Sequence, residues 1–350
     1  MYQQTHATTK LLIMNKYLRL LLAAVTSVFF ISCNQIKQPE KIQFFGEAQG
    51  TYYAVTYFAM DTLVTQNQID SLLVDFDLSA STWVGGSIIS RINNNDPDIK
   101  PDKYFTDIFK QAQRVSEMTN GAFDITVGPL VNAWGFGFKN RMDIDQHIID
   151  SLLPFVNYKA VRIIEGEVIK ENPNINIDYN AIAQGYSVDL LGGFLKKNGI
   201  ENYLVDVGGE VLAKGVKPDD NHWVVGIERP SEEIDSERKL KATLKISNKA
   251  IATSGNYRKF YEVDGVRYSH TINPKTGYPV KHSLLSATVM ADSAAIADAF
   301  ATAFMVMGLQ KAKLFLESHP GMEAYFIYSG ANGQLETYST GGLQSKITEQ

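Results

Sequence analysis

The sequence of 350 residues has a single cysteine, no excess of basic side chains and only one long apolar run. One cysteine excludes an internal disulfide framework and any redox or zinc site that needs a pair of cysteines. The chain has 33 Lys and Arg residues against 38 Asp and Glu residues, which gives a net charge of -5. A nucleic-acid-binding protein needs a basic face. We therefore expect no nucleic-acid partner.

The standard catalytic signatures are also missing. The sequence has no GxSxG, no Walker loop and no HExxH. The glycines of "GGFLKKNG" lie within a predicted helix and lack the spacing of a dinucleotide-binding loop. The composition is that of an ordinary globular protein, and the length suffices for one large or two ordinary domains.

The one apolar run lies near the N-terminus, in "MNKYLRLLLAAVTSVFFISC", residues 14 to 33. Lys16 and Arg19 precede an uncharged, largely apolar stretch from Leu20 to Ile31. This stretch is too short to span a bilayer comfortably and has the form of a signal-peptide core. It ends in "FISC", which resembles a bacterial lipobox with Cys33 as its cysteine.

These features predict a lipoprotein. We expect a signal peptide over residues 1–32, with Met14 as a second candidate start, and a lipidated N-terminus at Cys33 after cleavage. Residues 33–44 then form a linker and residues 45–345 a body tethered to the cell membrane on its periplasmic side, with the inner membrane favoured. The alternative is a core cysteine that follows a short anchor helix.

The pattern of the body favours an α+β fold. Apolar residues recur at helical spacing in residues 65–81, 103–121, 180–199 and 291–304. Short segments rich in aromatic and β-branched residues predict strands at 50–58 and repeatedly between 223 and 290. Because helices and strands do not alternate strictly, a single large mixed domain is favoured over a doubly wound sheet.

The predicted helix "ADSAAIADAFATAF" contains Asp298 and Thr302, which lie four residues apart and thus on one face. One interpretation is a buried aspartate paired with an arginine. The other is a hard metal ion such as Mg2+, which prefers oxygen ligands. The motif alone favours the first, because uncompensated charge is rarely buried.

Three polar turns break the core pattern. In "DYNAIAQGYSVD", Asp178 and Asn180 precede a helix whose free N–H groups suit a phosphate, or Asp178 is an ordinary capping residue. In "VDVGGE", Gly208 and Gly209 permit a close backbone approach or simply form a hairpin. In "YSHTINPKTGYPV", His270 lies among polar neighbours in a loop.

Taken in order, several segments resemble the ApbE family, the FAD:protein FMN transferases. They are "STWVGGSIISRIN", "GAFDITVGPLVNAWGFG", "DYNAIAQGYSVD", "VDVGGE", "VGIERP", "AIATSGNYR", "HTINPKTGYPV" and "SATVMADSAAIADAFATAF", from about Gln49 to Gly308. The resemblance implies an α+β enzyme, often exported and lipid-anchored. It further implies FAD as substrate, Mg2+ as cofactor and exported acceptor flavoproteins as partners, with FMN transferred to a threonine hydroxyl and AMP released.

The resemblance also implies the site residues. Asp298, Thr302 and the backbone carbonyl of Ala181 fall on the metal-ligand positions of the family. His270 is our candidate general base, because an imidazole titrates near neutral pH and this one lies close to a flavin-contacting position. The positions that contact FAD are Trp83, Ala122, Phe123, Asp124, Asp178, Gln184 and Ile272.

Four departures from the family pattern concern flavin binding. Gln49 stands where methionine is common, and Trp83 replaces a tyrosine while keeping a flat stacking face. Gln184 replaces a charged residue, and Asn273 stands where aspartate is frequent. None of these changes removes a metal ligand, so we expect an active enzyme with altered flavin affinity.

Two alternative functions remain. With water in place of threonine, the same site would hydrolyse FAD to FMN and AMP as a pyrophosphatase. A non-catalytic periplasmic flavin-binding lipoprotein belongs to a different class. The Asp298 and Thr302 pair argues against binding alone, because flavin binding needs no metal.

The lipid anchor is tested by the substitution Cys33→Ser. We expect the variant to stay uncleaved or to leave the membrane fraction, because serine offers no thiol for lipidation. Fractionation and the intact mass of the purified protein measure both outcomes. A variant that is processed and membrane-attached like the wild type would contradict the lipobox interpretation.

Overall fold

The computed structural model describes residues 14, 16, 39–137, 144–230, 239–256, 260–263 and 266–350. For residues 260–263 and 266–268 it describes the backbone alone. The chain divides into two units, residues 1–39 and 40–350, and the fold described here is that of the second. Cys33 lies outside the described residues. The predicted signal peptide also lies outside them, apart from Met14 and Lys16. Within the described part of the chain, no helix has both the length and the apolar character needed to cross a membrane.

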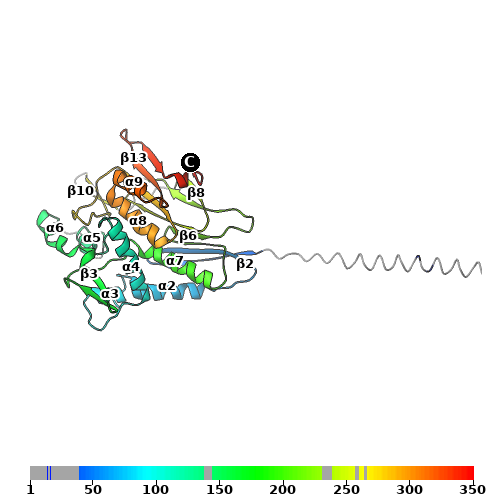
Figure 1. Ribbon diagram of the computed structural model, residues 1–350, viewed down its shortest axis with the longest axis horizontal. Coiled ribbons are helices and arrows are strands. Elements are labelled where there is room, and N and C mark those ends of the chain that lie inside the picture. Colours follow the sequence, from blue (N-terminus) through cyan, green and yellow to red (C-terminus); the bar gives the residue numbers. More distant parts are fainter. Residues whose placement is uncertain are drawn as a thin grey trace, which may run out of the picture. The chain divides into compact units, whose positions relative to one another are not determined.

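The second unit is built on an eight-stranded antiparallel sheet with the order β1-β2-β5-β6-β9-β12-β13-β14 (Figure 1). Its strands are β1 (Glu40–Ala48), β2 (Thr51–Ala59), β5 (Tyr203–Val207), β6 (Glu210–Lys214), β9 (Lys249–Gly255), β12 (Leu284–Ala291), β13 (Glu323–Ser329) and β14 (Leu335–Ser339).

Two tight hairpins place their turns at neighbouring points of this sheet. The turn between β1 and β2 is Gln49 (φ 54°) and Gly50 (φ 71°), and the turn between β5 and β6 is Gly208 (φ 62°) and Gly209 (φ 110°). Two consecutive residues of positive φ suit a type I′ connection, whose twist matches that of the strands. The "VGG" turn is therefore a hairpin, as one interpretation of the sequence predicted.

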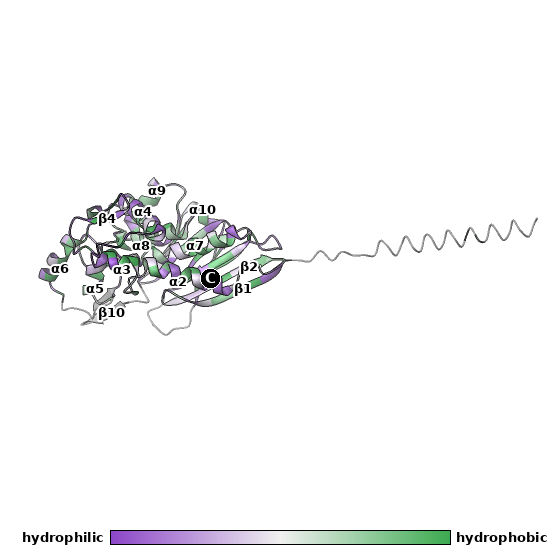
Figure 2. Cartoon of the chain, turned by 90° about the horizontal axis from the view of Figure 1, so that it is seen from below, coloured by the Kyte–Doolittle hydropathy of each residue, from purple (hydrophilic) through white to green (hydrophobic). Residues whose placement is uncertain are grey.

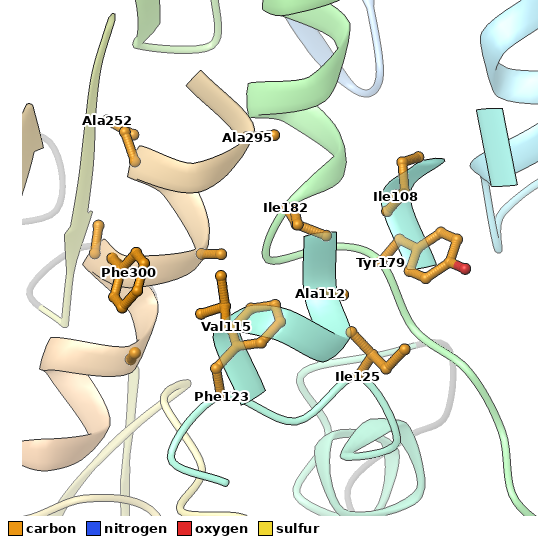
Figure 3. Packing of buried hydrophobic residues seen from close by; sticks show 14 of the residues in the cluster. Ile108, Ala112, Val115, Phe123, Ile125, Tyr179, Ile182, Ala252, Ala295 and Phe300 are labelled. Carbon is orange, nitrogen blue, oxygen red and sulfur yellow. The ribbon is translucent and has the colours of Figure 1, made fainter. Parts of the chain in front are cut away.

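Helices cover one face of the sheet. Helix α7 (Ala183–Lys197) packs on β5 and β6, and α8 (Ala294–Met307) packs on β6, β9 and β12. Helix α4 (Lys103–Met118) lies against α8, and α2 (Gln66–Ala80) lies against α7. Apolar side chains from α4, α8 and the following loops form the main core, which Figure 3 shows around Val115, Phe123 and Phe300.

A small sheet covers the other face. It contains β7 (Trp223–Glu228), β8 (Leu240–Ile246) and β15 (Ile347–Glu349). Because side chains alternate along a strand, Leu212 packs towards the helices while Val211 and Ala213 pack towards the small sheet. Figure 2 shows the corresponding mixture of hydrophilic and hydrophobic residues along β1 and β2. These layers confirm the predicted α+β class.

The remaining elements are short. The helices are α3 (Ile88–Asn93), α5 (Gly128–Ala133), α6 (Gln146–Leu152), α9 (Leu309–Ser318), α10 (Gly341–Gln344) and two 3-10 turns, Leu153–Phe155 and Tyr158–Ala160. The hairpins are β3 (Val161–Ile164) with β4 (Glu167–Lys170), and β10 (Phe260–Val263) with β11 (Val266–Ser269).

Some boundaries differ from the sequence-based expectation. Strand β1 begins at Glu40 and pairs with β2, so part of the expected linker 33–44 belongs to the sheet. The expected helix 291–304 begins at Ala294 instead, because β12 continues to Ala291 and Ser293 caps the helix by accepting a hydrogen bond from Ile296 N.

Helices α7 and α8 cross in unusually close contact. A Cβ atom on Gly185 would lie 2.3 Å from the carbonyl oxygen of Ala294, so only glycine fits there. One turn later on α7, Asp189 accepts hydrogen bonds from Ser293 Oγ at 2.6 Å, Ala294 N at 2.8 Å and Ala295 N at 3.0 Å. The carboxylate of one helix thus caps the N-terminus of the other and fixes how they cross.

The crossing is tested by Gly185→Ala. We expect this variant to lose about 1–3 kcal/mol of unfolding free energy, because the added methyl group forces the two helices apart. The matched control is Gly193→Ala on the same helix, where a Cβ atom meets nothing within 4 Å. The control should gain roughly 0.5–1 kcal/mol from helix propensity. Chemical denaturation measures both, and equal stabilities for the two variants would contradict the close crossing.

Candidate active site

The start of α7 is shaped by the turn that precedes it. Asp178 Oδ1 accepts a hydrogen bond from Asn180 N at 2.8 Å, and Ile182 has non-helical dihedrals (φ -152°, ψ -21°), so the helix begins at Ala183. The interpretation of Asp178 as the helix-capping residue is wrong, because the N-cap position is Ile182, which makes no side-chain cap. Asp178 instead closes the turn that leads into the helix.

This turn takes the carbonyl of Ala181 and the N–H of Gly185 out of the regular helical pattern. Gly185 N, which in a regular helix would donate to the carbonyl oxygen of Ala181, donates to Asp298 Oδ2 at 3.2 Å. Among the hydrogen bonds of the described residues, none ends on the carbonyl oxygen of Ala181. The structure therefore brings the turn at Ala181 and the carboxylate of Asp298 together, although 113 residues separate Gly185 from Asp298.

Asp298 is buried, with 7% of its surface exposed. Burial raises the pKa of its carboxyl from 3.8 to about 7, and the hydrogen bond from Gly185 N opposes part of that shift. Within the described part of the chain, Asp298 forms no ion pair with Lys, Arg or His. The arginine-pair interpretation therefore finds no support among the described residues.

Thr302 lies one turn further along α8 and is half-buried. Its Oγ1 is 3.1 Å from Ser254 Oγ, which β9 presents from the sheet below. Sequence reasoning did not single out Ser254, although the residue lies within the quoted segment "AIATSGNYR". Only the packing of α8 on β9 reveals that the two hydroxyl groups meet.

The two hairpin turns lie against α7. Gly208 N donates to Tyr52 O at 3.0 Å, which joins the turns to each other. A Cβ atom on Gly208 would lie 2.6 Å from Gln184 Nε2, so Gln184 reaches across this turn. Gln49 Oε1 accepts a hydrogen bond from Ser187 Oγ at 3.4 Å, while its Nε2 is buried and has no partner among the described residues.

The loop after β11 is held by α5 and the residues that follow it. Trp134 Nε1 donates to Gly277 O at 2.7 Å, and Ile272 packs into a small apolar cluster with Leu130. His270 is half-buried, and its ring meets the ring of Phe136 edge-on, with centroids 6.3 Å apart. The loop is linked to the turn before α7 because Gly128, the first residue of α5, lies against Asp178.

Two of the predicted FAD-contacting side chains are already engaged within the fold. Asp124 Oδ1 accepts hydrogen bonds from Thr126 N and Thr126 Oγ1, and its Oδ2 accepts one from Tyr158 N at 3.0 Å. Burial raises the pKa of this carboxyl. The ring of Phe123 lies in the main core (Figure 3). Both side chains are therefore used within the fold itself.

Ala122 and Trp83 are accessible. Ala122 lines a cavity of about 500 Å³ between the end of α4, the end of α8 and α9. Two lysines, Lys275 and Lys311, lie in its wall together with apolar side chains such as Met118. Trp83 exposes 65% of its surface.

The donors around Asp298 fit a hard divalent cation. A carboxylate, the hydroxyl of Thr302 and the carbonyl of Ala181 are all oxygen ligands, which Mg2+ prefers. No cluster of three or more His, Cys, Asp or Glu side chains arranged for a metal occurs in the described ranges. A cation here would therefore rely on the substrate or on water for its other ligands, which suits Mg2+.

The comparison with protein families and known proteins gives a consistent result. The ApbE family matches residues 49–326. An FAD:protein FMN transferase of Vibrio cholerae is 34% identical over 308 residues, covering 85% of this chain and 90% of that protein. One from Haemophilus influenzae is 32% identical over 351 residues, covering 96% of this chain and 99% of that protein.

Solved structures agree with the sequence comparison. The flavin transferase ApbE from Vibrio cholerae superposes with a TM-score of 0.79 at 32% identity, covering 88% of this chain and 99% of that one. The apo form of Pseudomonas stutzeri flavinyl transferase ApbE gives a TM-score of 0.78 at 29% identity, covering 89% and 98%.

The charge of Asp298 is tested by Asp298→Asn. Because the folded-state pKa of about 7 exceeds the ordinary value of 3.8, the metal-free fold loses stability as pH rises from about 4 to about 7. The variant should lack this loss and should melt at the same or a higher temperature than the wild type above that range.

The same melts repeated with Mg2+ complete the test. We expect Mg2+ to raise the melting temperature of the wild type and to leave that of Asp298→Asn almost unchanged. A variant that is strongly destabilised without metal, by about 3–5 kcal/mol, would indicate a broken buried ion pair instead.

Proposed function

The chain belongs to the ApbE family, and we propose that it is a metal-dependent FAD:protein FMN transferase that moves FMN from FAD to a threonine hydroxyl of an acceptor flavoprotein. The enzyme class, a flavin transferase, follows from relatives that are 32–34% identical over most of the chain. The observation that carries the metal dependence is the buried carboxylate of Asp298, which lies beside an unused backbone carbonyl and has no cationic partner among the described residues.

We assign Asp298, Thr302 and the carbonyl oxygen of Ala181 as the groups that hold the cation. When bound, a divalent cation would supply positive charge that neutralises the pyrophosphate of FAD and the departing AMP. The chain contributes a rigid frame for these oxygens, because Gly185 N orients the carboxylate and Ser254 Oγ orients the hydroxyl.

FAD binding draws on the surrounding surfaces. We propose that the cavity beside Ala122 receives part of FAD, since its volume of about 500 Å³ lies within the usual range for ligand sites. Lys275 and Lys311 would face the ligand with positive charge there. Trp83 supplies an exposed ring for stacking, and Gln184 and Gln49 supply neutral amide groups for hydrogen bonding.

In the reaction, the oxygen of the acceptor threonine forms a bond to the flavin-side phosphorus, and the bond between that phosphorus and the AMP oxygen breaks. His270 accepts the proton of the threonine hydroxyl, which alone is a poor nucleophile. The hydrogen bond from Trp134 Nε1 to Gly277 O anchors the loop that carries His270, which supports this role by limiting the movement of the loop before the substrates bind.

We also propose that the enzyme acts at a membrane surface. The predicted lipidation of Cys33 supports this placement, and exported flavoproteins with a threonine-containing acceptor motif would then be its partners. In the sequence, only the polar segment "NQIKQP" lies between that cysteine and β1, which begins at Glu40.

The function is tested by incubating the protein with FAD, Mg2+ and a candidate acceptor flavoprotein, followed by mass spectrometry. We expect the acceptor to gain the mass of FMN and AMP to be released, and we expect chelator or the substitution Asp298→Asn to abolish both. A matched acceptor whose threonine is replaced by valine should gain no mass. Free FMN without acceptor labelling would indicate a pyrophosphatase, and unchanged FAD would indicate binding alone.

A further inference from the structure

A second buried carboxylate lies near the proposed metal site and belongs to none of the groups assigned so far. Glu210 begins β6, directly after the turn of Gly208 and Gly209. Only 8% of its surface is exposed, and its Oε2 has no hydrogen-bond partner among the described residues. A buried carboxylate oxygen without a hydrogen bond or an opposite charge beside it is costly, so its retention needs an explanation.

The charges that act on Glu210 are negative. They belong to Asp298 and Asp206, and no ion pair of Glu210 occurs in the described part of the chain. The three carboxylates are not equivalent. Asp206 accepts hydrogen bonds from Gly209 N at 2.9 Å and from Tyr52 Oη at 3.1 Å, whereas Oε2 of Glu210 accepts none.

Glu210 reaches the site from the sheet, whereas Asp298 and Thr302 reach it from helix α8. Strand β6 lies under both α7 and α8, and α8 carries Asp298. The turn before Glu210 fits beneath Gln184 at the start of α7 because Gly208 has no side chain. The hairpin therefore directs Glu210 into the region between the starts of β6 and α7 and the middle of α8.

We propose that Glu210 is an outer-sphere group of the metal site, whose Oε2 accepts a hydrogen bond from a water molecule bound to the cation held by Asp298 and Thr302. This inference rests on the proposed metal dependence and adds a residue to it. Together, the carboxylates of Asp298 and Glu210 would balance the two positive charges of a divalent cation. A hydrogen-bonded water fits the preference of Mg2+ to keep part of its water shell.

The alternative is a structural role, in which Glu210 supports the hairpin and has no relation to the cation. The two roles predict opposite effects of Glu210→Gln, which keeps the volume and removes the charge. A structural role predicts a less stable metal-free protein with unchanged metal affinity. The outer-sphere role predicts a metal-free protein that is at least as stable as the wild type, because repulsion from Asp298 is removed, and a weaker affinity for the metal.

The experiment titrates Mg2+ into the purified full-length protein by calorimetry, with and without FAD, and records thermal melts in chelator. For Glu210→Gln, we expect the dissociation constant of Mg2+ to rise about 10- to 100-fold, the range observed when outer-sphere partners of metal ligands are removed. Glu210→Asp, which keeps the charge, should retain more of the affinity than Glu210→Gln. An unchanged dissociation constant in Glu210→Gln would overturn the proposal.

The matched control is Asp206→Asn, which removes a charge from the same hairpin where the carboxylate is already hydrogen-bonded. We expect this variant to bind Mg2+ like the wild type. An equal loss of Mg2+ affinity in Asp206→Asn and Glu210→Gln would mean that any negative charge nearby has the same effect, and it would overturn the assignment. A wild-type protein that binds no Mg2+ under either condition would overturn the proposed metal dependence together with this inference. Binding by the wild type with equal binding by Glu210→Gln would overturn the inference alone.

Discussion

The close crossing of α7 and α8 is the constraint on which the candidate site depends. Gly185 allows the helices to touch at Ala294, and Asp189 holds them in register by capping α8. Because the crossing is so tight, the first turn of α7 reaches Asp298, and Gly185 N donates to that carboxylate and not to Ala181. This packing contact thus orients the carboxylate and leaves the carbonyl of Ala181 without a hydrogen bond among the described residues.

The electrostatics of the site follow from this arrangement. Burial raises the pKa values of the carboxyl groups of Asp298 and Glu210, and among the described residues no basic side chain forms an ion pair with either. Basic groups are found instead in the cavity wall, at Lys275 and Lys311. This division supports the proposal that a divalent cation is held by the acidic groups and that the phosphates of FAD are attracted by the basic ones.

The sequence predicted the features that depend on short-range patterns. The helical stripes and the α+β class agree with the structure because the spacing of apolar residues along short segments decides them. The meeting of Thr302 with Ser254, and of Gly185 with Asp298, depends on sheet and helix packing across distant segments. The same holds for β1, whose pairing with β2 extends the folded unit back to Glu40. Resemblance to a family supplied candidate residues, but it could not show that the carboxylate of Asp124 is occupied within the fold.

The central claim is that Asp298, Thr302 and the carbonyl of Ala181 hold a divalent cation where FAD is cleaved. A crystal of the protein grown with Mn2+ and FAD, measured at the manganese absorption edge, tests this claim most directly. The account predicts an anomalous peak in contact with those three oxygen atoms and with phosphate oxygens of FAD. Bound FAD with no anomalous peak at Asp298, or with Mn2+ bound elsewhere, would contradict it.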